Sequence, residues 1–116
     1  MLVPEDFNTL VDNANTLGLY KKLILQLNKD LRFANIDLEF DVDTLPTSLK
    51  IVLKETIYYL IQEKFSDYLN LLYIVDVSEK EIKALDGNDT LKLSDDVTFL
   101  VLKRVWKKVW YKSQYI

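Results

Sequence analysis

Glycine and proline are scarce in this chain, and their scarcity constrains the possible folds more than any other feature. Only Gly18, Gly87, Pro4 and Pro46 interrupt a sequence of 116 residues. A β-rich fold needs frequent turns, and turns draw heavily on these two residue types. Most of the chain instead repeats apolar residues every three or four positions, as amphipathic helices do. We therefore predict an all-α protein, an irregular bundle of five or six helices, in one domain spanning residues 1–116.

Local signals place the expected helices along the chain. Pro4 followed by two acids is typical of a first helical turn, and Gly18 is typical of a helix end. Apolar periodicity predicts the later helices at residues 19–34, 49–65, 67–75, 78–85 and 94–112. The expected N-caps of the last three are Ser66, Ser78 and Ser94. Segment 49–65 is apolar on most of its surface, so we expect it to be the central helix.

One short segment departs from the helical pattern. Residues 36–43 alternate strictly between apolar and acidic side chains, IDLEFDVD. A period of two indicates an extended segment with one buried face and one acidic face. No partner strand is evident elsewhere, so the segment is either a strand or an arm laid over the helices. Its outward side chains form a set that we call the acidic row: Asp37, Glu39, Asp41 and Asp43.

The residue inventory excludes several kinds of chemistry. The sequence has no histidine and no cysteine, which excludes Ser-His-Asp and Cys-His catalysis and the usual zinc sites. Two isolated glycines cannot build a phosphate-binding or dinucleotide-binding loop. A carboxylate-only mechanism such as glycoside hydrolysis remains open, but nothing in the sequence favours it. We predict no catalytic residue and no cofactor, and thus a protein that is not an enzyme.

The acidic row also fails as a calcium loop. If Asp37 stood at the first position, the required glycine would fall on Val42 and the required bidentate glutamate on Ser48. The interleaved apolar side chains need a buried face, which a loop wrapped around an ion does not provide. We therefore predict no metal site.

Charge is distributed unevenly along the chain. All eighteen acids lie in residues 1–96, together with ten of the fifteen bases. The five remaining bases, which we call the basic row, are Lys103, Arg104, Lys107, Lys108 and Lys112. Such a separation of charge suits electrostatic recognition of a partner.

The last helix combines the basic row with two tryptophans. At 100° per residue, Trp106 and Trp110 share one face with several valines, and the five bases occupy the opposite half. Three interpretations follow: the indoles lie in the core, or they form an interface with another chain, or the bases bind lipid headgroups or nucleic-acid phosphates. The acidic remainder of the chain opposes the third interpretation. We expect the indoles to be covered by the protein's own core.

Two runs of sequence resemble a set of small bacterial proteins of Bacteroidota type. They are Asn70–Glu79, NLLYIVDVSE, and Phe99–Trp110, FLVLKRVWKKVW. The resemblance extends over most of the chain and rests on helix faces and caps. That set has no assigned activity, so the resemblance implies a bacterial cytoplasmic setting and no site residues.

The sequence as a whole predicts a small soluble binding or assembly module in the cytoplasm. The longest apolar run, Leu71–Val75, is far shorter than the ~18 residues of a membrane-spanning helix, and the N-terminal segment lacks the basic residues of an export signal. The expected partner is another protein or a second copy, through the acidic and basic rows, which could pair within one chain or between copies. Peripheral binding of an anionic membrane or nucleic acid by the basic row is the alternative, and we do not expect it.

Overall fold

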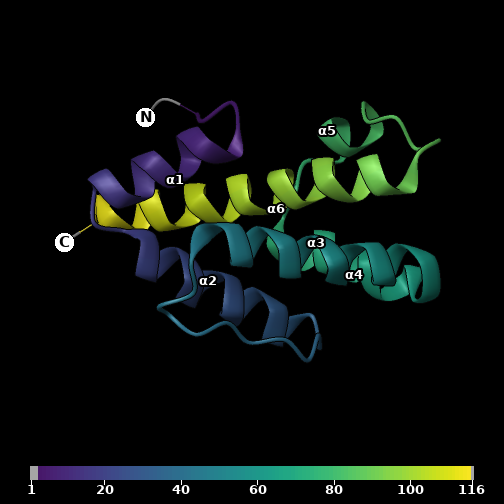
Figure 1. Cartoon of the computed structure of the whole chain (residues 1–116), viewed down its shortest axis with the longest axis horizontal. Coiled ribbons are helices and arrows are strands. Elements are labelled where there is room, and N and C mark those ends of the chain that lie inside the picture. Colours follow the sequence, from purple (N-terminus) through teal and green to yellow (C-terminus); the bar gives the residue numbers. More distant parts are fainter. Residues whose placement is uncertain (1–2, 116) are drawn as a thin grey trace.

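The computed structural model describes residues 3–115, and these form six helices and no strand (Figure 1). The helices are α1 (Phe7–Thr16), α2 (Tyr20–Phe33), α3 (Pro46–Glu63), α4 (Phe65–Val75), α5 (Glu79–Lys83) and α6 (Thr90–Ser113). The all-α prediction is confirmed, and the predicted segments match the observed helices to within about one helical turn. Buried apolar residues from every helix except α5 form one core.

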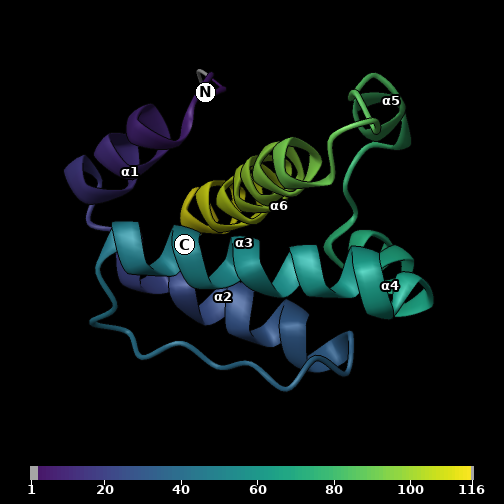
Figure 2. The same ribbon diagram turned by 45° about the vertical axis from the view of Figure 1, so that its right-hand side comes forward.

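The central helix is α6 and not α3. It packs against α1, α2, α3 and α4, and Figure 2 shows it between α1 on one side and α3 with α2 on the other. Nine residues of α6 are buried, against four of α3. The prediction for residues 49–65 was wrong because Ile51, Val52 and Tyr59 on the outer side of α3 stay exposed. The sequence shows which side chains are apolar, but only packing shows which of them a neighbour covers.

The first helix is delimited by a carboxylate and a glycine. α1 begins at Phe7, because the Asp6 carboxylate accepts a hydrogen bond from the Thr9 N–H at 2.8 Å. The prediction that Pro4 starts the helix was therefore wrong. Gly18 ends it as predicted: its φ is +67°, and the N–H of Leu19 reaches back to the Ala14 carbonyl at 2.8 Å.

Two of the three predicted serine caps were wrong. The N-cap of α6 is Asp89, five residues before the expected Ser94, and its carboxylate accepts hydrogen bonds from the first turn. Ser94 is buried inside the helix, and its hydroxyl donates to the Thr90 carbonyl. Ser66 lies inside α4, because the chain bends sharply at Lys64 and the helix starts directly after it. Ser78 caps α5 as predicted, accepting a hydrogen bond from the Glu81 N–H.

Residues 36–43 form an arm that lies beside α2 and pairs with no strand (Figure 1). The predicted alternation is confirmed, since Phe40 is buried, the other apolar residues are partly buried, and all four acids are exposed. The side chain of the buried Asn28 in α2 makes the two hydrogen bonds that a neighbouring strand would make. Its amide NH2 donates to the Phe40 carbonyl, and its amide oxygen accepts from the Phe40 N–H, both at 2.8 Å. The arm therefore satisfies its innermost backbone groups through one side chain.

Candidate functional site

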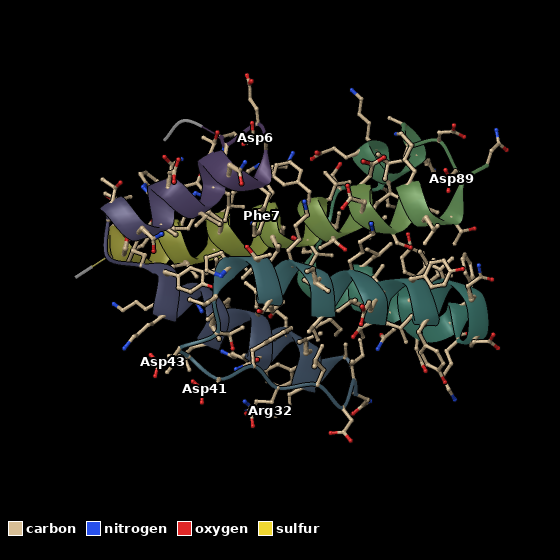
Figure 3. The ribbon with its side chains drawn as sticks, in the orientation of Figure 1. Asp6, Phe7, Arg32, Asp41, Asp43 and Asp89 are labelled. Carbon is tan, nitrogen blue, oxygen red and sulfur yellow. The ribbon has the colours of Figure 1, made fainter. Side chains whose placement is uncertain are left out.

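The acidic row lies on the outer side of the arm and is exposed to solvent. Figure 3 labels Asp41 and Asp43 along this outer edge, with Arg32 of α2 nearby. Within residues 3–115, Asp43 alone of the four acids forms an ion pair, with Lys21 at 3.5 Å, and both side chains are more than two-thirds exposed. Among the described residues, none of these carboxylates pairs with the basic row. Of the two arrangements that the sequence left open, pairing of the rows within one chain therefore does not occur.

The basic row is largely engaged by other side chains of the same molecule. Lys103 pairs with Glu81, Arg104 with Asp76 at 3.0 Å, and Lys108 with Asp30 at 2.8 Å. The Lys112 ammonium donates to the Gln26 side chain at 2.7 Å. In the described part of the chain, Lys107 alone of the five has no such contact. Three of the five positive charges are thus balanced by acids from other segments of the same chain.

A hollow of about 300 Å³ lies between the turn before α5 and the middle of α6. Three members of the basic row line it, Lys103, Arg104 and Lys107, but Asp76 and Glu81 lie in the same wall. Two of the three positive charges are therefore already paired. This leaves a weak attraction for an anion, because a paired charge must first lose its partner.

The two tryptophans of α6 occupy different environments. Trp106 is 1% exposed and belongs to the core, as predicted. Its indole N–H has no hydrogen-bond partner in the described residues. Trp110 is partly buried against the core, with its ring 5.2 Å from that of Tyr111 in an edge-on arrangement. The indole face of α6 is thus covered by the chain itself and does not form a large exposed surface.

The largest unpredicted feature is a row of exposed apolar side chains on α4. Eight of its eleven residues are apolar, and Tyr68, Leu71, Leu72 and Val75 are buried on the inner face. On the outer face Phe65, Leu69 and Tyr73 are 54%, 50% and 81% exposed. We call these three residues the α4 ridge. Their spacing of four residues places them on adjacent turns over about 12 Å.

Two structural features shape the α4 ridge. The Phe65 ring lies 5.4 Å from that of buried Tyr68, which supports it from below. The sharp bend at Lys64 places α4 at one end of the molecule, so no other helix covers its outer face (Figures 1 and 2). Asp67, the one charged residue within α4, lies about 160° around the helix from Leu69. The ridge is therefore an uncharged apolar strip in contact with water.

A signal for the ridge was present in the sequence. A helix that packs on one side needs apolar residues over roughly a third to a half of its circumference. Segment 65–75 carries them over most of its circumference, which predicts that it is contacted from more than one side. The prediction of a helix over residues 67–75 gave only its bounds and did not use this signal.

Another hollow, of about 340 Å³, lies between α3 and the start of α6, and it has a more apolar lining. It is lined by Ile51, Tyr58 and Leu91 together with two charged residues, Lys54 and Glu55. Its apolar residues come from two helices and are interrupted by charge, so it is a less continuous surface than the α4 ridge.

Known proteins add nothing to this description. The chain matches no protein-family model, no curated protein and no solved structure. Among the described residues, no helix is long and apolar enough to cross a membrane, and no three acidic side chains come together as metal ligands could. The candidate site is therefore defined by geometry alone.

Proposed function

We propose that this protein is a non-enzymatic assembly module that binds another protein chain through the α4 ridge. The observation that carries the proposal is the exposure of Phe65, Leu69 and Tyr73 in one uninterrupted strip. Large aromatic and aliphatic side chains grouped on a surface mark interaction sites, because burying them releases ordered water and gains roughly 25 cal/mol per Å² of apolar area. Aromatic residues are also enriched at the energetic centres of interfaces.

The alternative, binding of anionic lipid or nucleic acid by the basic row, has less support. Such binding draws its free energy from unpaired cations that replace counterions at phosphates. Lys103, Arg104 and Lys108 are each held by an acid of the same chain. The location that we propose is the cytoplasm, which a cysteine-free chain suits because that compartment is reducing.

Photo-crosslinking in the native host tests the proposed function. A photoreactive phenylalanine analogue at position 73 should form a discrete adduct with a protein chain. The same analogue at position 67, exposed on the opposite side of α4, is the matched control and should not form that adduct. Adding Leu69→Lys to the position-73 variant should abolish the adduct, because a lysine in the strip must be desolvated on binding.

Two outcomes contradict the proposal. If positions 73 and 67 give the same adducts, or if position 73 gives none, the α4 ridge is not a binding surface. Separately, purified protein should show no salt-sensitive binding to anionic vesicles or to a single-stranded oligonucleotide. Binding that is strong at low salt and disappears on substitution of Lys107 would favour the alternative function.

A further inference from the structure

We infer that the chain bound at the α4 ridge is a second copy of this protein, paired so that the two α4 helices run antiparallel about a two-fold axis at Leu69. This inference rests on the proposed function and names its partner. It follows from the symmetry of the ridge itself and is compatible with the charges at its two ends.

The ridge is self-complementary in shape. An aromatic residue stands four positions before Leu69 and another four positions after it, Phe65 and Tyr73. Rotation by 180° about an axis through Leu69 therefore places Phe65 of one copy against Tyr73 of the other, and Leu69 against its own counterpart. A two-fold interface requires this kind of match, since the same surface must serve both partners. Phenyl and phenol rings in contact prefer offset or edge-on packing, and both rings are free to adopt it.

The charges at the two ends of the ridge are compatible with this rotation. Its N-terminal end carries Glu63 and Lys64, both exposed. Its C-terminal end carries Asp76, whose side chain is 76% exposed, and the Arg104 side chain paired with it. The two-fold axis brings the first pair of one copy toward the second pair of the other. Each pair has zero net charge, so the two ends do not repel one another. A parallel arrangement would align the two helix dipoles unfavourably, whereas the antiparallel one sets them in opposition.

The size of the ridge sets the strength of the pairing. The three side chains of the ridge are each at least half exposed. Together they offer a few hundred Å² of apolar surface per copy, which is below the ~800 Å² per partner of a standard stable interface. We therefore expect a weak, concentration-dependent dimer with a dissociation constant of roughly 1–100 µM. Because apolar contact dominates, raising the salt concentration should leave the dimer intact.

Sedimentation velocity of the purified chain tests the stoichiometry. The wild type should shift from monomer to dimer with rising concentration, and Leu69→Lys should weaken this association at least tenfold. Asp67→Asn is the matched control: it raises the net charge by the same amount, but on the side of α4 opposite Leu69, and should associate as the wild type does. Helical circular dichroism of each variant shows whether it remains folded, and Leu69→Gln provides a second, uncharged substitution.

Cysteine substitution tests the geometry, and the cysteine-free sequence makes it unambiguous. Leu69→Cys should form an intermolecular disulfide under mild oxidation, because facing residues at a helix crossing come within disulfide reach. A mixture of Phe65→Cys and Tyr73→Cys should be joined by a short bis-maleimide, whereas either variant alone should not be. Cross-linking of each variant with itself would indicate a parallel pair and overturn the antiparallel arrangement.

A wild type that stays monomeric up to millimolar concentration, with no cross-link at position 69, would overturn self-pairing. That result leaves the proposed function standing if the photo-crosslinked adduct contains a different protein. If the protein neither self-associates nor forms a photo-crosslinked adduct at position 73, both the dimer and the proposed function are excluded. A dimer that dissociates with salt and resists Leu69→Lys would instead place the contact between the acidic and basic rows of two copies.

Discussion

The Nζ of Lys108 lies 2.8 Å from Oδ2 of Asp30, which joins α6 to α2 across 78 positions of sequence. Both side chains are largely withdrawn from water, at 18% and 6% exposed. Asp30 also accepts a hydrogen bond from the Gln26 amide, and the carbonyl of that amide accepts from Lys112. Two members of the predicted basic row thus serve to attach the last helix to the bundle.

Removing one partner of this pair should destabilise the protein. Lys108→Ala leaves the buried Asp30 carboxylate without its cation, so we expect a loss of about 2–4 kcal/mol in the free energy of unfolding. Asp30→Ala should cost less, because the more exposed lysine can reach water. Chemical denaturation measures both, with Lys107→Ala as the control that should stay within about 0.5 kcal/mol of wild type. Equal losses for Lys108→Ala and Lys107→Ala would show that the pair adds no stability.

The arm should depend on Asn28. Asn28→Ala removes both hydrogen bonds to Phe40 and leaves a buried N–H and carbonyl unpaired, which should lower the free energy of unfolding by about 2–3 kcal/mol. The Phe40 amide should exchange with deuterium much faster in this variant, while amides in the middle of α6 keep most of their protection. Arg32→Ala, an exposed position on α2, is the control and should leave the arm unchanged. Unaltered exchange at Phe40 would contradict the role given to Asn28.

The free energy of unfolding should fall at high pH because the fold withdraws two tyrosine hydroxyl groups, at least in part, from water. Burial raises the pKa of the Tyr68 phenol above its ordinary value of 10.0, and the same is true of Tyr20. Above pH 10 the unfolded chain loses these protons more readily than the folded one, so unfolding becomes more favourable as pH rises further. Tyr68→Phe should reduce the slope of stability against pH in this range. The exposed Tyr59 replaced by phenylalanine is the control, and an identical slope in both variants would refute the prediction.

The two glycines should respond differently to substitution. Gly18 has a φ of +67°, and a Cβ there would meet no atom within 4 Å, so the effect of Gly18→Ala is purely one of backbone strain. We expect a loss of about 1–2 kcal/mol. A Cβ at Gly87 also meets open space, and its φ lies outside the left-handed region, so Gly87→Ala should be neutral or slightly stabilising. Thermal unfolding of the two variants side by side measures the difference.

Local features of the fold were predictable wherever a short stretch of sequence decides them. Gly18 and Ser78 end and begin helices through hydrogen bonds to residues a few positions away, so their neighbours in sequence suffice. Asp89 and Ser94 show the limit of this reasoning, because both are good caps and the sequence does not rank them. The longer helix buries Leu93 partly and Ser94 fully against the bundle, and this tertiary packing selects the earlier start.

The candidate site was less predictable, because exposure and pairing are properties of distant parts of the chain. All five bases of the basic row lie on α6, but the acids that pair with three of them come from three other segments: Asp30, Asp76 and Glu81. No periodicity within residues 99–112 could reveal them. The α4 ridge likewise becomes a surface only because the bend at Lys64 carries α4 to the end of the molecule, where the other helices pack on its inner face and leave its outer face uncovered.

The sequence alone is enough to predict that this protein is helical, where most of its helices end, and that residues 36–43 present one apolar and one acidic side. These properties follow from side-chain periodicity and capping, which act over a few residues. Tertiary packing makes α6 the central helix, pairs three of the five bases of the basic row with acids of the same chain, and leaves Phe65, Leu69 and Tyr73 in contact with water. Each of these depends on which helix faces pack together, and apolar faces of similar width offer several packings among which the sequence pattern does not choose.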